Sequence, residues 1–414
     1  MAVLTPVRQA IEIILEDFSV LDTQIASLSK STGRVLATSI CSTLPLPPFD
    51  ASSVDGFALR WDDVITARTD NPISLQVVAD IPAGVAPSCN VQMRQAARIM
   101  TGAALPSGAN AIVMVEDTDY GVRSSGTPHP KEVKVMRSVS PGENIRPRGQ
   151  DIQEGEKTLS GNQFIRPEDV GMLAMLGKVD IPVIRRPCIA IITPGEELTS
   201  PGKPLMPGKI YDSNSHMIRS LIEAGGGISI DSGIIADNIV AVRNSLDEAI
   251  DKGVDCLVST GGVSVGAYDF VRAVLETDGE LKLWRVNIRP GKPLAFGHYR
   301  NVPFIGLPGN PVSAFVSFKV FVQPVLRKML GLPRAQHTVR KVQLNEMIHS
   351  DGRESYLRAV VNLKDDCWIA HLTGPQGSGN LHSLVQANAL LVIPAGVKSL
   401  NAGSKVDAWF YSAD

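Results

Sequence analysis

The sequence predicts a multidomain protein in which a central α/β domain, with a mainly parallel sheet, is combined with separate β modules. Its 414 residues are too many for one compact core. Strand-like and helix-like patterns alternate between about Pro187 and Leu330, which favours parallel strands joined by helices. On both sides of that stretch, short strand-like runs are broken by Pro, Gly and Asn, a pattern typical of β modules.

The first part of the chain begins with an amphipathic pattern that predicts a helix. Thr5 is a candidate N-cap, Pro6 takes the first helical position, and apolar residues follow at helical spacing up to Phe18. A second helical stretch, "RPEDVGMLAMLG", comes only after a series of strand-like runs. This order predicts a discontinuous helical linking domain, residues 1–45 and 140–180, with an antiparallel β module, residues 46–139, inserted into it.

The alternating stretch predicts an α/β domain over residues 181–330, with helices on both faces of its sheet. Its strand-like runs include "CIAIIT", "DCLVST" and "VPFIGL". After "GLPR" the pattern returns to short strands such as "YLRAVVNL" and "VDAWFY". We therefore expect a small C-terminal β domain over residues 331–414.

Composition and charge exclude several classes of protein. The net charge of -2 leaves no basic surplus for non-specific binding of nucleic acid. No apolar run approaches the roughly 18 residues of a membrane span, and the N-terminus does not resemble a signal peptide, so we expect a cytosolic protein. The five cysteines are scattered and never in C-x-x-C spacing, which favours neither a disulfide framework nor a zinc site.

Four polar or glycine-rich turns follow predicted strands of the α/β domain. Ligands bind outside the carboxyl ends of the strands in an open α/β sheet, so these turns should share one rim. The turn "STGGVSVGAYD" can present backbone N–H groups to an anion, although it is neither a Walker A loop nor a G-x-G-x-x-G motif. Ordinary turns and helix caps are the alternative, since they favour the same residue types. The rim side chains would be Glu197, Asp237, Ser264, Asp269, Asn310 and Ser313.

The loop "NIRPGKPLAFG" adds two cations, Arg289 and Lys292, directly after an apolar strand. Two cations on a stiff loop suit phosphate or another tetrahedral oxyanion, whereas a solvated charged loop is the alternative. The later segments "GRESYLRAV" and "TGPQGSGNLHSL" supply Arg353, Arg358, Gln376 and Ser378.

The predicted β module carries a second set of polar residues, namely Asp50, Asp55, Thr101, Arg146, Arg148 and Asp151. An interdomain salt bridge is the alternative explanation for the last three. The sequence has no G-x-S-x-G elbow and no H-E-x-x-H motif, and its seven histidines are isolated. Carboxylates, hydroxyls, cations and glycine turns instead suit a divalent metal together with a phosphorylated substrate.

Eight motifs, in order from Phe49 to Phe315, resemble those of the molybdopterin molybdenumtransferases, the family of the bacterial MoeA proteins and of the E domain of gephyrin. They are "FDASSVDGFALR", "RIMTGAALPSGANAIV", "GENIRPRGQDI", "TPGEELTSPG", "IYDSNS", "STGGVSVGAYD", "RPGKPLAFG" and "GLPGNPVSAF". The resemblance implies an elongated homodimer of four-domain subunits, whose third domain is similar to the MogA fold. It also implies Mg²⁺-dependent insertion of molybdate into adenylylated molybdopterin, which releases AMP and yields molybdenum cofactor.

The resemblance also implies roles for individual residues. The family's catalytic positions match Asp55, Thr101, Asp151, Glu197, Asp237 and Asp269, and the candidates for Mg²⁺ among them are Glu197, Asp237 and Asp269. Substrate binding is expected at Gly261, Gly262, Ser264, Gly266, Pro308, Asn310 and Pro311. Molybdate binding is expected at Arg289, Lys292, Ser313, Arg358 and Ser378.

The implied partners are a second copy of the chain, which completes a shared cleft, a MogA-like adenylyltransferase and maturation proteins of molybdoenzymes. Neither nucleic acid nor a membrane is expected. The chain departs from the family pattern at Arg289, where lysine is common, at Val54, where methionine is common, and in "TPGEEL", which replaces "TGDEL". The alternative functions are molybdopterin adenylylation, which a MogA-like fold performs alone, and a gephyrin-like scaffold.

Overall fold

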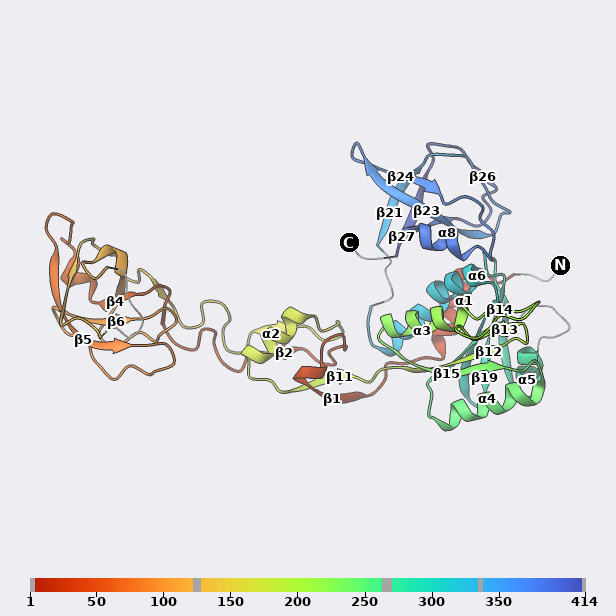
Figure 1. The fold of residues 1–414 in the computed structure, drawn as a ribbon, viewed down its shortest axis with the longest axis horizontal. Coiled ribbons are helices and arrows are strands. Elements are labelled where there is room, and N and C mark those ends of the chain that lie inside the picture. The colour runs from red at the N-terminus through yellow and green to blue at the C-terminus, as the bar shows by residue number, and fades with distance from the viewer. Residues whose placement is uncertain (1–3, 122–127, 263–269, 334–337, 412–414) are drawn as a thin grey trace. The chain divides into compact units, whose positions relative to one another are not determined.

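The computed structural model describes residues 4–121, 128–262, 270–333 and 338–411, which fall into two compact units. The first unit comprises Met1–Thr38, Gly161–Val170 and Val179–Asp414. The second comprises Ser39–Ser160 and Gly171–Lys178. Figure 1 labels their helices and strands.

A six-stranded sheet forms the centre of the first unit. Its order is β15 (Ile228–Ile235), β12 (Cys188–Pro194), β16 (Cys256–Thr260), β20 (Val302–Leu307), β19 (Pro293–Tyr299) and β17 (Gly279–Arg285). The first four strands pair in parallel, whereas β19 is antiparallel to both β20 and β17. The expected mainly parallel sheet is therefore mixed, because Arg300 and Asn301, both at positive φ, form a tight hairpin turn between β19 and β20.

Helices cover both faces of this sheet, because its central strands are apolar on both sides. One face is covered by α1 (Val7–Glu16), α3 (Asn214–Ala224), α6 (Pro311–Ser317) and α7 (Gln323–Met329), and the other by α4 (Ile239–Asp251) and α5 (Phe270–Asp278). In β12, Ile189 and Ile191 join the core under the first group, while Ala190 and Ile192 join the core under α4 and α5. Figure 1 shows the two groups of helices on opposite sides of the sheet.

The helix α1 packs on the α/β sheet, although the sequence placed it in the linking domain. Val7, Ala10 and Ile14 are buried in the same core as Ile191. An amphipathic helix gains most of its stability from such packing, and the sheet offers the larger apolar surface. The linking region instead contains the helix α2 (Pro167–Met175) and the antiparallel strand pair β1 (Thr23–Ser27) and β11 (Asp180–Ile184).

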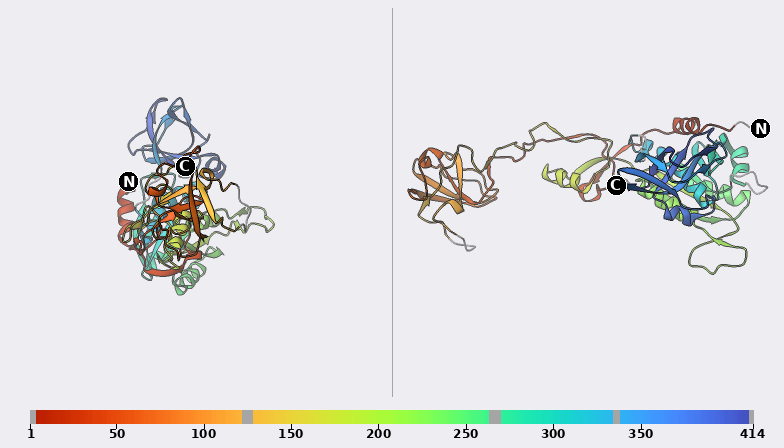
Figure 2. Two further views of the ribbon diagram at one scale, coloured as in Figure 1. Left: turned by 90° about the vertical axis from the view of Figure 1, so that its left-hand side faces the viewer. Right: turned by 90° about the horizontal axis from the view of Figure 1, so that it is seen from above.

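The C-terminal residues form a small closed β-barrel, which confirms the expected C-terminal β domain. Its strands pair in the order β23 (Glu354–Lys364), β24 (Cys367–Leu372), β21 (Val339–Leu344), β27 (Lys405–Phe410) and β25 (Ala389–Ile393), and pairing of β25 with β23 closes the ring. Leu357, Ala359 and Val361 alternate into its core. The short strand β18 (Ile288–Arg289) pairs in parallel with β23 and joins the α/β part to the barrel, which Figure 2 draws in blue.

The second unit is built around a five-stranded sheet. The order is β7 (Ala111–Met114), β4 (Gly56–Leu59), β6 (Gln95–Ile99), β5 (Ile73–Ile81) and β8 (Glu132–Val135). All its pairs are antiparallel except β5 with β6, so the expected antiparallel module contains one parallel pair. The connection through residues 82–94 is long enough to return the chain before β6 begins.

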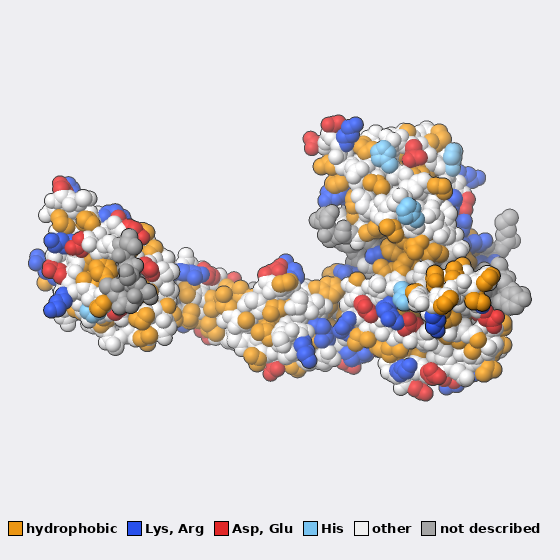
Figure 3. Space-filling view, viewed as in Figure 1, with side chains coloured by type: hydrophobic (Ala, Val, Ile, Leu, Met, Phe, Trp, Pro, Cys, Tyr) orange, Lys and Arg blue, Asp and Glu red, His pale blue; other side chains and the backbone are white. Residues whose placement is uncertain are grey.

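Two short pairs complete the second unit, namely β2 (Ile40–Cys41) with β10 (Lys157–Leu159) and β3 (Ala51–Ser52) with β9 (Ile145–Arg146). Figure 3 shows basic and acidic side chains interspersed over the visible face of each unit, as the small net charge of -2 would suggest. Within the described ranges, no helix combines the length and the apolar character that crossing a membrane requires.

Candidate functional site

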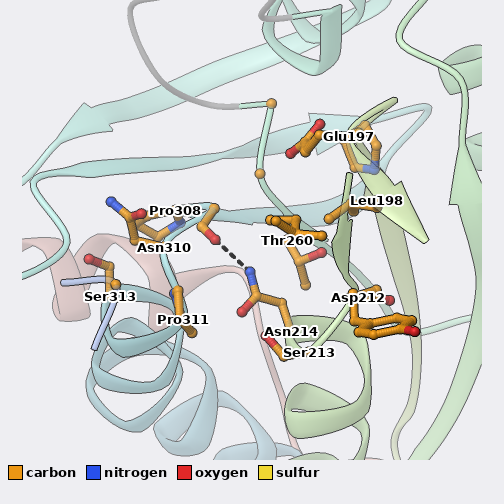
Figure 4. Close-up of a pocket in the computed structure, with 18 of the residues that line it drawn as sticks. Glu197, Leu198, Asp212, Ser213, Asn214, Thr260, Pro308, Asn310, Pro311 and Ser313 are labelled. Carbon is orange, nitrogen blue, oxygen red and sulfur yellow. Dashed lines mark hydrogen bonds between the residues drawn. The ribbon is translucent and has the colours of Figure 1, made fainter. Parts of the chain in front are cut away.

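A pocket of about 770 Å³ opens in the first unit, where the strands β12, β16 and β20 end. The turns that follow these strands form its walls, as expected for an open α/β sheet. Figure 4 shows Glu197, Thr260, Asn310 and Ser313 arranged around it. The pocket is lined by predicted site residues from these turns and from the turn after β15, together with Gly379 and Leu381: Glu197, Asp237, Gly261, Gly262, Pro308, Asn310, Pro311 and Ser313.

Two glycine turns approach each other closely at the pocket. Gly261 has φ +124°, and a Cβ atom there would lie 3.8 Å from the Cα atom of Gly309. Gly262 has φ +68°, and its Cβ atom would lie only 2.6 Å from Cγ2 of Val271. Only glycine adopts these conformations readily, and at Gly262 a side chain would also collide with α5. The glycines of this turn are therefore required by backbone geometry as well as by the open pocket.

Two of the predicted acidic residues, Glu197 and Asp237, line the same pocket. A Cβ atom at Gly195 would lie 2.9 Å from Oε2 of Glu197, so glycine leaves room for that carboxylate. Asp237 accepts a hydrogen bond from the backbone N–H of Glu196 at 3.0 Å, which fixes one carboxylate oxygen. Two hard carboxylate ligands in one open pocket fit Mg²⁺, which usually takes few protein ligands and completes its shell with phosphate and water. Among the described residues, no group of three or more His, Cys, Asp or Glu is placed to hold a metal ion by itself.

The start of α3 contributes a pocket wall to which the sequence assigned no role. Asp212, Ser213 and Asn214 line the pocket, and all three belong to the motif "IYDSNS". The side-chain amide of Asn214 donates a hydrogen bond to the carbonyl oxygen of Gly309 at 2.6 Å, which Figure 4 shows as a dashed line. The motif was a visible signal, but a hydrogen bond across 95 residues of sequence cannot be read from it.

The barrel contributes a loop that ends at the pocket, and Arg358 holds this loop in place. The guanidinium of Arg358 is fully buried. It donates hydrogen bonds to Oγ of Ser383 at 3.0 Å and to the carbonyl oxygen of Gly377 at 2.9 Å, with longer bonds to the carbonyl oxygens of Pro375 and Gln376 at 3.3 Å. Burial lowers the pKa of Arg358, and the nearby charge of Arg289 lowers it further. Arg358 was predicted to bind the oxyanion. In the structure its guanidinium is buried against the carbonyl groups of residues 375–377 and supports that loop.

Ser378 lies at the end of that loop and contacts the α/β part. Its hydroxyl lies 3.1 Å from Nδ2 of Asn310, which donates the hydrogen bond. Its carbonyl oxygen accepts a hydrogen bond from the backbone N–H of Val312 at 3.0 Å. The loop and the start of α6 are therefore joined by two hydrogen bonds beside Ser313, another predicted molybdate-binding residue.

The remaining predicted cations lie on the loop after β17. Arg289 is half-buried in β18, opposite Ser355 of the barrel, and its charge lowers the pKa of Asp351, although Arg353 is the larger cause. Lys292 is exposed, and the next residue, Pro293, lines the pocket. Of the two cations, Lys292 is the more exposed to solvent.

The second unit holds the other predicted catalytic residues. Asp55 accepts hydrogen bonds from both the backbone N–H of Thr101, at 2.8 Å, and its hydroxyl, at 3.0 Å. Asp151 forms an ion pair with Arg146, and both side chains are about half exposed. Both residues belong to the second unit, so this ion pair is not the interdomain salt bridge that the sequence left as an alternative. Ser264, Gly266 and Asp269 lie outside the described residues.

Three family models match the chain in succession. The MoeA N-terminal region (domain I and II) matches residues 5–177, a probable molybdopterin binding domain matches residues 190–328, and the MoeA C-terminal region (domain IV) matches residues 341–411. Together they extend over both units and over most of the described structure.

Named relatives and solved structures match over nearly the whole chain. The molybdopterin molybdenumtransferase of Nostoc sp. is 39% identical over 93% of this chain and 88% of its own length. Molybdopterin molybdenumtransferase 2 of Mycobacterium tuberculosis is 37% identical over 92% of this chain and 93% of its own. A crystal structure of a molybdopterin biosynthesis MoeA protein from Pyrococcus horikoshii is 32% identical, with a TM-score of 0.79 over 99% of this chain and 100% of that one.

A pair of glycine substitutions tests how much the turn after β16 depends on its close packing. Gly262 and Gly253 have similar φ angles, +68° and +72°, but a Cβ atom at Gly253 would meet none of the described residues within 4 Å. We expect Gly253→Ala to show only the backbone strain, about 1–2 kcal/mol. Gly262→Ala should lower the midpoint of thermal unfolding further, because its methyl group also meets Val271. Equal shifts of the unfolding midpoint in the two variants would mean that α5 moves to accommodate the methyl group at position 262 without loss of stability.

Proposed function

Since the chain belongs to the MoeA family, the molybdopterin molybdenumtransferases, we propose that the pocket of its first unit binds adenylylated molybdopterin for molybdate insertion. The chain acts in molybdenum cofactor biosynthesis, as a transferase that inserts molybdate into molybdopterin. The observation that carries this assignment is the match to named transferases at up to 39% identity over more than nine-tenths of the chain. The adenylylated form of the substrate and the release of AMP are the parts that we propose.

Within the pocket, we propose that the glycine turns hold the phosphate end of the substrate. Gly261, Gly262 and Gly309 bring backbone close to the ligand space because they carry no side chains. Backbone N–H groups of such turns suit phosphate oxygens. Glu197 and Asp237 would hold Mg²⁺ and its water at the same rim. Asp269 stays a third candidate from the sequence alone, since it lies outside the described residues. Bound Mg²⁺ would offset the negative charge on the phosphate that leaves with AMP.

The incoming molybdate is proposed to lie where the barrel meets the α/β part. Ser313 lines the pocket, and Ser378 is tied to Asn310, so two hydroxyl groups lie at this wall. Lys292 and Arg289 supply positive charge on the adjoining loop. Arg358 supports the loop that carries Ser378 and adds positive potential from behind it. A tetrahedral dianion suits such a combination of cations and hydroxyls.

We also propose that the chain works as a homodimer in which Asp55 and Thr101 of one subunit serve the cleft of the other. The support is that these residues form an arranged carboxylate and hydroxyl pair in a different unit from the pocket. Asp151 and its partner Arg146 are proposed to act beside them. A MogA-like adenylyltransferase as supplier, maturation proteins as acceptors and a cytosolic location stay predictions from the sequence.

Replacing Glu197 tests the proposed reaction. Purified protein would be incubated with adenylylated molybdopterin, molybdate and Mg²⁺, and AMP release would be followed. The wild-type protein should release AMP, and Glu197→Gln should do so at least tenfold more slowly, because the side chain keeps its size but loses the charge that favours a metal ion. The matched control is Glu196→Gln, since this neighbour does not line the pocket. Absence of AMP from the wild-type reaction would refute the adenylylated substrate.

Mixing two inactive variants tests the shared cleft. Asp55→Ala and Glu197→Ala should together recover roughly a quarter of the wild-type activity, because half of the dimers would be mixed and each would hold one intact cleft. Asp55→Ala mixed with Thr101→Ala is the control, since both defects lie in the second unit and no cleft would be intact. If subunits exchange and the first mixture stays inactive, the cleft is not shared.

Lys292 offers the cleanest test of molybdate binding, because it is exposed whereas Arg358 also supports a loop. A charged hydrogen bond contributes about 1.5–3 kcal/mol, so Lys292→Ala should raise the half-saturating molybdate concentration by about tenfold or more. The affinity for adenylylated molybdopterin should hardly change. Lys252→Ala, another exposed lysine of the first unit, is the control. A variant that keeps its molybdate dependence and loses pterin binding would assign Lys292 to the substrate phosphates.

A further inference from the structure

The segment Asp212–Ser215 has an arrangement that none of the roles above explains. Asp212 is only 6% exposed and accepts hydrogen bonds from the backbone N–H of Ser215, at 3.1 Å, and from the Ser215 hydroxyl. These contacts fix the first turn of α3, because a carboxylate satisfies a helix-start donor that has no partner inside the helix. The segment is thus a rigid part of the pocket wall from which the next side chain can act on other elements.

Asn214 extends from this rigid start to the turn after β20. Its Nδ2 atom lies 2.6 Å from the carbonyl oxygen of Gly309, and this hydrogen bond joins the wall formed by α3 to the turn that leads into α6. Figure 4 shows Asn214 between Thr260, Ser213 and Pro311, within the pocket lining. The contact is therefore part of the pocket and links two of its walls directly.

The orientation of the Asn214 amide is fixed by its surroundings. Within the described part of the chain, its Oδ1 atom is buried and has no hydrogen-bond partner. Turning the amide over would bring Oδ1 against the carbonyl oxygen of Gly309, where two acceptors would face each other. Asn214 therefore keeps its Nδ2 donor on the carbonyl oxygen of Gly309, although this leaves Oδ1 buried without a hydrogen bond, which costs free energy.

We propose that Asn214 is a positioning residue that sets the separation between the start of α3 and the turn at Gly309, and so the width of the substrate pocket. This rests on the proposed function, since it takes the ligand of the pocket to be the phosphate-bearing substrate. Gly309 also lies beside Gly261, so a hydrogen bond on Gly309 acts on the gap between the two glycine turns. Asn214 acts through the turn and takes no part in the chemical step.

The variants distinguish the effect of losing the N–H donor from the effects of side-chain size and of helix stability. Asn214→Ala removes the hydrogen bond and adds no charge. Asn214→Asp keeps the size and removes the N–H donor, but an acid near a helix N-terminus stabilises the helix itself. Ser220→Ala is the matched control, because Ser220 is exposed on the same helix and its hydroxyl donates a hydrogen bond within that helix, to the carbonyl oxygen of His216.

Three measurements would be compared across the variants: kcat and KM for adenylylated molybdopterin at saturating molybdate, the dissociation constant of AMP, and amide hydrogen exchange of Gly309, Asn310 and Val312, the residues of this turn that carry a backbone N–H. We expect Asn214→Ala to raise the KM and the AMP dissociation constant about tenfold, which corresponds to about 1.4 kcal/mol, with kcat within about twofold. Exchange at Gly309, Asn310 and Val312 should become faster. Asn214→Asp should raise the KM and the AMP dissociation constant at least as much, and Ser220→Ala should match the wild type.

The result can overturn the proposal in three ways. An unchanged KM and unchanged exchange in Asn214→Ala would show that the hydrogen bond does not set the pocket. A defect in Asn214→Asp alone would be an effect of charge. Loss of kcat and of thermal stability together would indicate simple support of α3. The hydrogen-exchange comparison needs no substrate, so it tests the role of Asn214 even if the wild-type protein releases no AMP and the proposed function falls.

Discussion

The pocket depends on the close approach of two turns that end neighbouring parallel strands, β16 at Gly261 and β20 at Gly309. Parallel pairing brings both carboxyl ends to one edge of the sheet, and the absence of side chains lets the two backbones lie almost in contact. The walls of the pocket follow from this approach. Glu197 and Asp237 belong to the turns of the next two strands along the same edge, and α3 and α6 start from it.

A buried positive charge is the second constraint on the site. Arg358 has no ion-pair partner among the described residues, and its charge is offset by the carbonyl dipoles of residues 375–377. Burying a charge in this way is unfavourable unless every donor is used, so the arginine and the loop must be folded together. The loop then holds Ser378 against Asn310, and the barrel becomes part of the pocket instead of a neighbouring domain.

The sequence predicted those features that depend on local patterns. The alternation around "CIAIIT" and "DCLVST" predicted strands, and the strand-end rule predicted that Glu197, Asp237 and Asn310 would meet, as they do at the pocket. Other features depend on contacts between distant residues. The place of α1 on the sheet and the bond from Asn214 to Gly309 have no local signal. Arg358 is a further example, since the family resemblance assigned it to molybdate, whereas its buried guanidinium donates hydrogen bonds to backbone carbonyls.

The pairing of β18 with β23 also constrains the order in which parts of the structure can form while the chain is being synthesised. Arg289 lies in β18, but its strand partner Ser355 is made 66 residues later. A ribosome-bound chain that ends before β23 can already hold every strand of the six-stranded sheet. It cannot yet fix the segment with Arg289, nor can it place Ser378. A nascent chain therefore acquires its α/β scaffold first, while the contacts of Arg289 and Ser378 with the barrel form only when the last part of the polypeptide has emerged.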